Sequence, residues 1–533
     1  MTDERMTGEA VPGEPAGEEP AGALAELRRR RALTGDSARP EAVARRHAAG
    51  RRTARENIAA LIDPGSFVEY GQLATAAQER RLPARELMRQ TPADGLIAGI
   101  ARINGAHFGE RAACGVLSYD YLVMAGTQGL RGHHKSDRLL GLISKLRLPA
   151  VFFAEGGGGR PNDTDYPVVS ALDVETFALW AGLSGLVPRI AVVAGWCFAG
   201  NAIIAGAADL IVATRDASLG VAGPAMVAAA GLGEHAASDI GPAPVLASQG
   251  VVDVLARDDA EAVAVTRKLV GYFQGPLPAG QAADQSRLRA VIPGERAPFD
   301  VRPVITTLAD PDSVTFLREE FAPELVTALG RIDGRPAGFL ANQTMRMAGS
   351  LTSAASDKAA RFLQLCDAHG LPVISLVDTP GYLAGPAAER TGIVRHASRM
   401  LVAGARLQVP LIGVVLRRGY GLGAQAMLGG STRRPLLTVA WPGAHMGPMG
   451  LEGAVRLANR KELAGLGESH REARVRELTA AYQEHVTVLN AARAFEIDDV
   501  IDPAETRGVI AAALAAAAGR HGFTGSGRPV DTW

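Results

Sequence analysis

Two short turns in this sequence could place backbone N–H groups against a negative charge. One contains Ala199-Gly200-Asn201, and the other contains Gly421-Leu422-Gly423-Ala424. Each follows an apolar run typical of a buried strand, and small residues let a ligand approach the backbone closely. Backbone N–H groups at the start of a helix stabilise anions and oxyanions. We therefore expect the chemistry of this protein at these turns.

The two turns belong to a duplicated sequence. Four matches identify the duplication: Leu148-Pro149 with Leu371-Pro372; Val187-Pro188 with Val409-Pro410; Lys135, Arg138 and Leu140 with Lys358, Arg361 and Leu363, which lie 223 positions later; and Ile103-Asn104-Gly105 with Ile332-Asp333-Gly334. Such matches in one order at nearly one spacing predict two homologous domains. One site could therefore draw on a turn from each domain.

The elements around the turns suggest an α/β fold. Short β-rich runs alternate with helical stretches in a β-β-α order, which predicts a layered or spiral architecture in each half. We expect a disordered tail over residues 1–22, an N-terminal domain over 23–275, an ordered Pro-rich linker over 276–315 and a C-terminal domain over 316–533.

Composition excludes several classes of function. Lys plus Arg and Asp plus Glu each number 56, so no global field favours nucleic acid or an anionic membrane. Arg28-Arg29-Arg30-Arg31 is interpreted as a solvated helix face or a subunit contact. No apolar run reaches the roughly 18 residues of a membrane span. Three isolated cysteines predict neither a disulfide nor a metal site, and they fit a cytoplasmic location.

Several motifs resemble one protein family. They are TARENIAALIDPGSFVEY, AEGGGGRPNDTD, GWCFAGNA, DTPGYLAG, GIVRHASRML, RRGYGLGAQA and FEIDDVIDP. Over about residues 23–515 the chain is similar to the carboxyltransferase (β) subunit of biotin-dependent acyl-CoA carboxylases. Within that family it most resembles the carboxyltransferase segment of single-chain long-chain acyl-CoA carboxylases. The resemblance implies two tandem crotonase-type ββα spiral domains. It also implies a hexamer built from dimers, with each active site between the N-half of one subunit and the C-half of another.

The resemblance also implies an enzymatic reaction and its residues. CO₂ would pass from N1-carboxybiotin, carried on a separate protein, to the α-carbon of an acyl-CoA, in fatty acid metabolism. Backbone N–H groups of Gly200 and Asn201 would hold the thioester enolate, and those of Gly423 and Ala424 the biotin ureido oxygen. The released biotin nitrogen would take the α-proton, so no metal and no side-chain base is expected. Further residues are expected to contact the acyl-CoA (Ala199, Gly156, Gly157, Gly421, Ala426) or biotin (Thr379, Pro380, Gly381, Tyr420).

Two positions depart from the pattern of the family. Asn201 stands where many relatives have glycine, and its side chain is expected to narrow or polarise the site. Ala426 stands where short-chain enzymes often carry an acidic residue, which favours an acyl group longer or bulkier than acetyl. One extra methylene is worth only about 1–3 kcal/mol in an apolar pocket, so this preference is weak.

Two features of a complete carboxylase are not found in this sequence, and their absence predicts partner proteins. The sequence has no Met-Lys-Met biotin-attachment motif and no second large region for an ATP-dependent biotin carboxylase. We therefore expect a biotin carboxylase and a biotin carboxyl carrier as separate chains or as one α subunit. Two alternatives remain open. The protein could be a biotin-linked decarboxylase or transcarboxylase subunit acting on malonyl-type CoA esters, or an inactive scaffold that binds acyl-CoA.

Other polar or glycine-rich motifs have simpler interpretations. Gly156–Gly159 lacks the Gly-Lys-Ser/Thr of a nucleotide-binding loop. His133-His134 and Cys197 lack partners for a metal or a nucleophile, so packing roles are expected. Arg417-Arg418 could contact a carboxylate or the CoA diphosphate, or solvent or another subunit. Asp378 opens the Thr379-Pro380-Gly381 turn, where either a biotin pocket or simple turn chemistry is possible.

Overall fold

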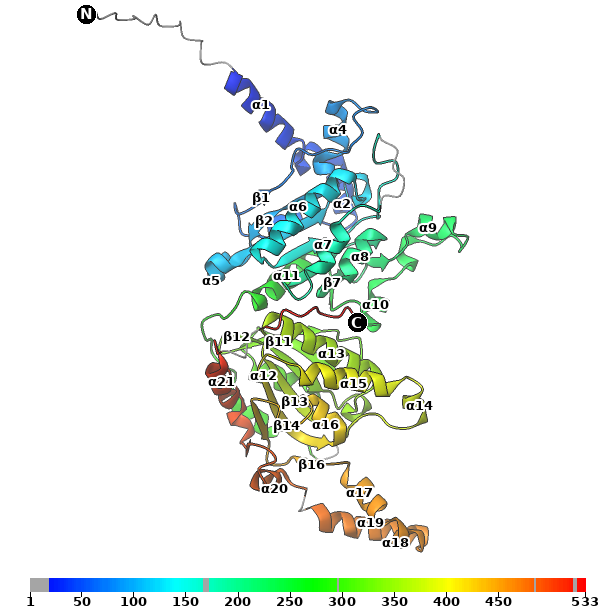
Figure 1. Cartoon of the computed structure of the whole chain (residues 1–533), viewed down its shortest axis with the longest axis vertical. Helices are drawn as coiled ribbons and strands as arrows, with labels where there is room; N and C mark the ends of the chain where they lie inside the picture. The colour runs from blue at the N-terminus through cyan, green and yellow to red at the C-terminus, as the bar shows by residue number, and fades with distance from the viewer. Residues whose placement is uncertain (1–18, 166–171, 295–296, 484–485, 521–524) are drawn as a thin grey trace, which may run out of the picture.

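The protein has two lobes stacked along its long axis, each built on one β-sheet (Figure 1). The structure is a computed structural model that describes residues 19–165, 172–294, 297–483, 486–520 and 525–533. The expected tail over 1–22 therefore lies largely outside the described residues, and the first helix begins at Glu19. Among the described residues, no helix is both long and apolar enough to cross a membrane.

The N-terminal lobe holds a seven-stranded sheet in the order β1-β2-β3-β4-β5-β7-β9. β1 to β3 are antiparallel and the remaining pairs are parallel, while β6 and β8 form a separate parallel ladder. The strands are β1 (Val68–Glu69), β2 (Leu96–Arg102), β3 (Ala113–Tyr119), β4 (Ala150–Phe153), β5 (Arg189–Val193), β6 (Trp196–Phe198), β7 (Leu210–Thr214), β8 (Ser218–Gly220) and β9 (Val254–Ala256). The helices are α1 (Glu19–Ala32), α2 (Pro40–Ala48), α3 (Ala54–Leu61), α4 (Ala84–Gln90), α5 (Gly105–Phe108), α6 (Leu130–Leu146), α7 (Thr176–Gly182), α8 (Gly200–Gly206), α9 (Pro224–Ala229), α10 (Ala243–Ser248) and α11 (Asp259–Phe273).

The C-terminal lobe holds an eight-stranded sheet in the order β10-β11-β12-β13-β14-β15-β17, with β16 paired to β14. β10 to β12 are antiparallel and the others parallel. The strands are β10 (Thr315–Leu317), β11 (Leu325–Ile332), β12 (Arg335–Asn342), β13 (Val373–Thr379), β14 (Leu411–Tyr420), β15 (Leu437–Ala440), β16 (His445–Gly447) and β17 (Asp499–Val500). The helices are α12 (Arg302–Leu308), α13 (Ser353–His369), α14 (Pro386–Glu389), α15 (Ile393–Ala405), α16 (Gly421–Met427), α17 (Leu451–Ala458), α18 (Arg460–Ala464), α19 (Glu468–Gln483), α20 (Val488–Arg493) and α21 (Thr506–Ala517).

The duplication is visible in the order of the elements. An antiparallel hairpin (β2-β3 or β11-β12) is followed by a long helix (α6 or α13) and then by two parallel strands (β4-β5 or β13-β14). Each long helix contributes a buried lysine whose amine donates to backbone carbonyls: Lys135 to Ala93 O and Lys358 to Leu325 O. The repeated sequence therefore folds into repeated structure.

The Pro-rich segment between the copies packs into the C-terminal lobe. Val304, Ile305 and Leu308 of α12 are buried in one cluster with Phe339 and Ile374 of the sheet. Pro303 stands in the first turn of α12, where a helix tolerates proline. The described part of residues 276–315 thus contributes to the C-terminal core.

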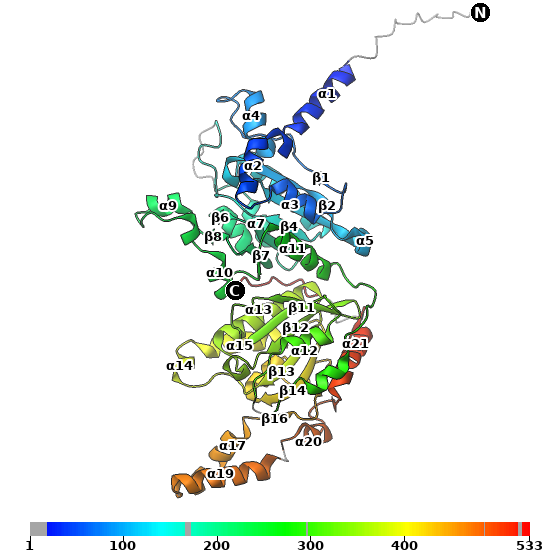
Figure 2. The same ribbon diagram turned by 180° about the vertical axis from the view of Figure 1, so that it is seen from behind.

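Three segments lie outside the sheets of the two lobes: the C-terminal residues, α1, and the helices α17 to α19. The C-terminal residues run back between the two lobes (Figures 1 and 2). There Ser184 Oγ donates to Val530 O and accepts a hydrogen bond from Val530 N. α1 projects from the N-terminal lobe, and α17 to α19 form an arm on the C-terminal lobe.

Candidate active site

The first turn places two unbonded N–H groups at the start of α8. β6 ends at Phe198, and Ala199 takes an unusual backbone conformation with φ 52° and ψ −125° before the helix begins at Gly200. In the described part of the chain, no acceptor bonds the N–H of Gly200 or Asn201. A Cβ on Gly200 would lie 2.4 Å from Gln128 Oε1. A side chain at position 200 would therefore displace Gln128.

The Asn201 side chain does not face open space. The residue is 0% exposed. Its Oδ1 accepts a hydrogen bond from Gly158 N at 3.0 Å, and its Nδ2 donates to Gly126 O at 3.4 Å. The expectation that this side chain narrows or polarises the site is wrong, because the carboxamide is committed to two backbone groups in the interior.

A glycine-rich loop packs against the first turn. Gly156 is buried and its N–H donates to Trp196 O, whereas Gly157 is exposed. Arg160 closes the loop with two ion pairs, to Asp94 at 2.5 Å and to Asp163 at 2.7 Å. Burial raises the pKa of Asp94 despite the opposing effect of Arg160. Of Gly156 and Gly157, both expected to contact the acyl-CoA, only Gly157 is exposed in this chain.

The second turn repeats this arrangement in the C-terminal lobe. β14 ends at Tyr420, Gly421 has φ 59°, and α16 begins there. The N–H of Gly423, in the first turn of α16, lacks an acceptor among the residues that the structure describes, and Ala424 follows it as the fourth residue of the helix. A Cβ on Gly423 would lie 2.7 Å from Gly381 Cα, so this helix start touches the Thr379-Pro380-Gly381 turn. These contacts bring the expected biotin residues together.

The other expected residues of the second site differ in exposure. Pro380 is exposed and Tyr420 is half-buried at the end of β14. The Thr379 hydroxyl accepts a hydrogen bond from Gly381 N at 3.1 Å, which closes the turn. Ala426 is 1% exposed and belongs to the hydrophobic core. In one chain Ala426 is therefore a core residue, and its contact with an acyl group stays a prediction.

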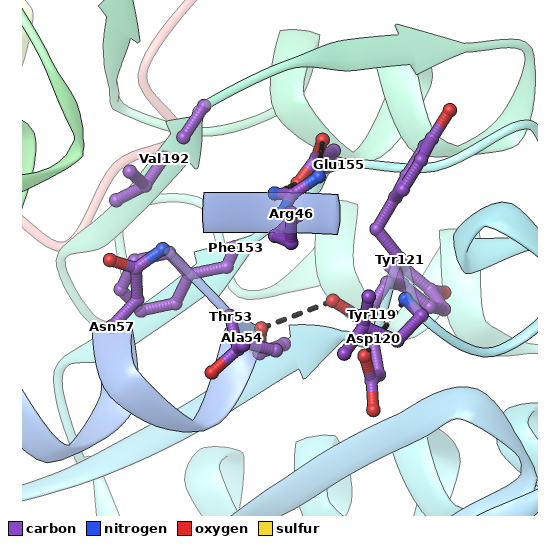
Figure 3. Close-up of a pocket in the computed structure, with 13 residues that line it drawn as sticks. Arg46, Thr53, Ala54, Asn57, Tyr119, Asp120, Tyr121, Phe153, Glu155 and Val192 are labelled. Atoms are coloured by element: carbon purple, nitrogen blue, oxygen red, sulfur yellow. Dashed lines mark hydrogen bonds and ion pairs between the residues drawn. The ribbon is translucent and has the colours of Figure 1, made fainter. Parts of the chain in front are cut away.

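A buried carboxylate lies near the C-terminal end of the central strand of each lobe. Glu155 after β4 pairs with Arg46 of α2, whose Nη1 lies 2.9 Å from Glu155 Oε1 beside the ring of Tyr121 (Figure 3). Burial raises the pKa of Glu155 against the opposing effect of Arg46. In the other lobe Asp378 accepts hydrogen bonds from Arg417 Nε at 3.0 Å and Arg418 Nε at 2.7 Å. The two arginines thus contact a carboxylate of their own chain.

The remaining candidates have packing roles. His133 Nδ1 lies 2.9 Å from Thr176 Oγ1, and burial lowers the pKa of this histidine. Cys197 is buried, which raises the pKa of its thiol and disfavours a nucleophilic thiolate. Within the described ranges, no three His, Cys, Asp or Glu side chains converge as a metal site would require.

Three features of the site were not expected from the sequence. The Arg46–Glu155 pair joins residues from separate elements. A second buried carboxamide, Asn342, bonds Asp378 N and Gly349 O. The third feature is a turn that occurs once in each lobe. It had a sequence signal, because Met124-Ala125-Gly126 recurs 223 positions later as Met347-Ala348-Gly349.

The two turns lie in different lobes of one chain, α8 in the upper lobe and α16 in the lower lobe of Figure 1. Each turn offers a pair of N–H groups at a helix start, which suits a developing oxyanion. Two such turns can stabilise two negative charges.

Known proteins match nearly the whole chain. The carboxyl transferase domain matches residues 45–525. The propionyl-CoA carboxylase beta chain of Saccharopolyspora erythraea is 32% identical over 520 residues, which cover 92% of each chain. The methylmalonyl-CoA carboxyltransferase 12S subunit of Propionibacterium freudenreichii subsp. shermanii is 33% identical over 486 residues, covering 89% of this chain and 90% of that one.

Solved structures agree with these matches. A single-chain, multi-domain long-chain acyl-CoA carboxylase superposes with a TM-score of 0.88 and 50% identity. The match covers 92% of this chain and 48% of that one, so this chain spans about half of that protein. The transcarboxylase 12S structure, a hexamer assembly with methylmalonyl-CoA bound, gives a TM-score of 0.81 at 31% identity and covers 96% of this chain. The expected fold of two crotonase-type domains is confirmed.

Proposed function

Because the chain belongs to the carboxyl transferase family, we propose a mechanism in which its two turns share one reaction. The protein is a biotin-dependent carboxyltransferase that acts on an acyl-CoA ester. In the proposed site the N–H groups of Gly200 and Asn201 bind the thioester oxygen as it gains the charge of an enolate. The N–H groups of Gly423 and Ala424 bind the ureido oxygen of biotin.

One observation carries this assignment: each lobe presents unbonded N–H groups in the first turn of a helix, at a glycine where a side chain would collide with its neighbours. Such preorganised donors are worth more in a water-excluded site than in water, because they need no reorganisation as charge develops. The N–H groups in the turn around Gly423 suit the ureido oxygen of biotin for the same reason, because they are preorganised donors. Carboxybiotin, when bound, supplies CO₂ and a nitrogen that accepts the α-proton.

The position of the two turns supports a site shared between subunits. The turns lie in different lobes of one chain, so we infer that the N-terminal lobe of one subunit meets the C-terminal lobe of another. The 12S relative is a hexamer assembly, and we propose the same assembly here. We also propose a biotin carboxylase and a biotinylated carrier as partners. We further propose an acyl group longer or bulkier than acetyl, because Ala426 stands where short-chain relatives often carry an acidic residue.

The reverse reaction tests the function without the partners. The purified protein is incubated with biocytin as acceptor and with malonyl-, methylmalonyl- or longer alkylmalonyl-CoA as donor, and the decarboxylated CoA product is measured by chromatography. We expect biocytin-dependent turnover, with the best rate on a donor longer than malonyl-CoA. Turnover without biocytin would contradict the proposal in favour of a decarboxylase. Binding of CoA esters without turnover on any donor would contradict it in favour of a scaffold.

A further inference from the structure

Each lobe contains the same strained turn. Met124, Ala125 and Gly126 have φ values of 49°, 54° and 65°, and Met347, Ala348 and Gly349 have 47°, 53° and 80°. Two consecutive non-glycine residues in the left-handed region cost free energy, so the surroundings must hold the turn in place. These turns are called the left-handed turns below.

A buried asparagine bonds the left-handed turn of the N-terminal lobe. Asn201 donates to Gly126 O at 3.4 Å and accepts from Gly158 N at 3.0 Å. The fit is tight, since a Cβ on Gly156 would lie 2.3 Å from Asn201 Nδ2. One carboxamide therefore ties together the left-handed turn, the glycine-rich loop and the first turn of α8.

A second buried asparagine makes the corresponding bond to the left-handed turn of the C-terminal lobe. Asn342, also 0% exposed, donates to Gly349 O at 3.3 Å and accepts from Asp378 N at 3.1 Å. Gly349 is the counterpart of Gly126 in the duplicated sequence.

The two asparagines occupy positions that are not equivalent. Asn342 is the last residue of β12, and the residue 223 positions before it is Tyr119. Asn201 lies in α8, and the residue 223 positions after it is Ala424. The same bonds to the left-handed turn thus arise from different places in the repeat, which indicates that the fold requires the bonds and not a particular position.

We propose that the side chains of Asn201 and Asn342 are positioning groups that brace the two catalytic turns. The inference rests on the proposed function. Asn201 orients the peptide between Gly200 and Asn201, because its carboxamide fixes the first turn of α8 against the glycine-rich loop. Asn342 braces the biotin side, because its partner Asp378 directly precedes Thr379. Each side chain acts through backbone groups and touches no reacting atom.

The matched variants Asn201→Ala and Asn342→Ala separate the two roles. In the reverse reaction we expect Asn201→Ala to lower kcat at least about tenfold, with KM for biocytin changed less than about threefold. Asn342→Ala should instead raise KM for biocytin at least about fivefold, with a smaller change in KM for the CoA ester. Equal losses in all parameters from both variants, or wild-type values from either, would overturn the proposal.

Asn201→Asp adds a readout that loss of stability alone would not give. An ionised aspartate opposes the Gly126 carbonyl, whereas a protonated one can donate to it. Because burial raises the pKa of a carboxyl group, the ratio of variant to wild-type kcat should rise as pH falls from 8 to 6. A ratio that does not change with pH would contradict the proposal that the Asn201 side chain positions the first turn of α8.

Amide hydrogen exchange tests the brace without any turnover. In Asn201→Ala the N–H of Gly158 loses its acceptor, so exchange in residues 156–160 should quicken at least about tenfold. Exchange in residues 376–382 should stay at the wild-type rate. Asn342→Ala should give the reverse pattern. Unchanged exchange at both loops would overturn the inference even if the wild type is an active carboxyltransferase. If exchange is faster in the variants but the wild type is inactive, the positioning role of the asparagines is supported and only the proposed function is rejected.

Discussion

At the residue scale, Gly200 and Gly423 exclude side chains for different reasons. A Cβ on Gly200 would press on Gln128 Oε1, the end of a side chain that also donates to Tyr119 OH. A Cβ on Gly423 would press on the backbone of Gly381, which cannot move without the turn that contains it. A side chain at position 423 would therefore displace the turn at Gly381, which is expected to contact biotin. A side chain at position 200 would first displace Gln128.

Gly200→Ala should lower kcat of the reverse reaction at least about tenfold, because the displaced neighbours turn the N–H groups of α8 away from the enolate oxygen. Binding of the CoA ester, measured by calorimetry, should change less than about threefold. Gly206→Ala is the matched control on the same helix, where a Cβ meets no atom within 4 Å. Equal kcat values for the two variants would remove Gly200 from the mechanism.

At the element scale, a buried lysine joins each long helix to the segment before the hairpin. Lys358 of α13 donates to Arg318 O at 2.9 Å, Phe321 O at 2.8 Å and Leu325 O at 2.6 Å. Lys135 of α6 makes the equivalent contact with Ala93 O. These amines bond carbonyls that would otherwise be buried without a donor.

The pH dependence of stability should report Lys358. Burial lowers the pKa of its amine to about 7 from 10.5. Between these values the unfolded chain binds more protons than the folded chain, so stability rises with pH. From pH 7 to pH 9.5, wild type should gain up to about 3 kcal/mol in unfolding free energy relative to Lys358→Met. Denaturant unfolding at both pH values measures this gain, with the exposed Lys145→Met as control; a difference that does not change with pH would contradict it.

Local patterns determined how much of these elements could be predicted. The turns at Gly200 and Gly423 were predictable because each depends on a few adjacent small residues after an apolar strand. The brace at Asn342 was not, because its partners Gly349 and Asp378 meet it only after β12 and β13 pair. The core role of α12 was missed because proline suggested a linker, although Pro303 stands where a helix tolerates it.

At the scale of the whole molecule, the C-terminal residues contact both lobes and hold them together. Val530 is buried and bonds Ser184 of the N-terminal lobe. Its neighbours bond the C-terminal lobe, Asp531 to Arg399 at 2.6 Å and Thr532 O to Arg361 Nε at 3.3 Å. The lobes also meet directly, where Arg318 Nε donates to Asp253 Oδ1 at 2.9 Å.

Val530→Ala should cost about 2 kcal/mol of unfolding free energy, because it exposes apolar surface between the lobes. Thermal unfolding would show this as a lower Tm. Val68→Ala, at a position 61% exposed, should change stability by less than about 0.5 kcal/mol. If the two variants unfold at the same temperature, the C-terminal residues do not fasten the lobes.

In the proposed enzyme, one active site combines the first turn of one subunit with the second turn of another. Subunit mixing tests this arrangement. Gly200→Val and Gly423→Val, each inactive alone, are co-expressed with different affinity tags, and the mixed oligomers are purified through both tags. In a two-fold pair of unlike variants, one site has two intact turns and the other has none. About half of the pairs in a randomly mixed hexamer are unlike, so about a quarter of the wild-type rate should return. No activity in oligomers shown by mass spectrometry to contain both variants would contradict a shared site.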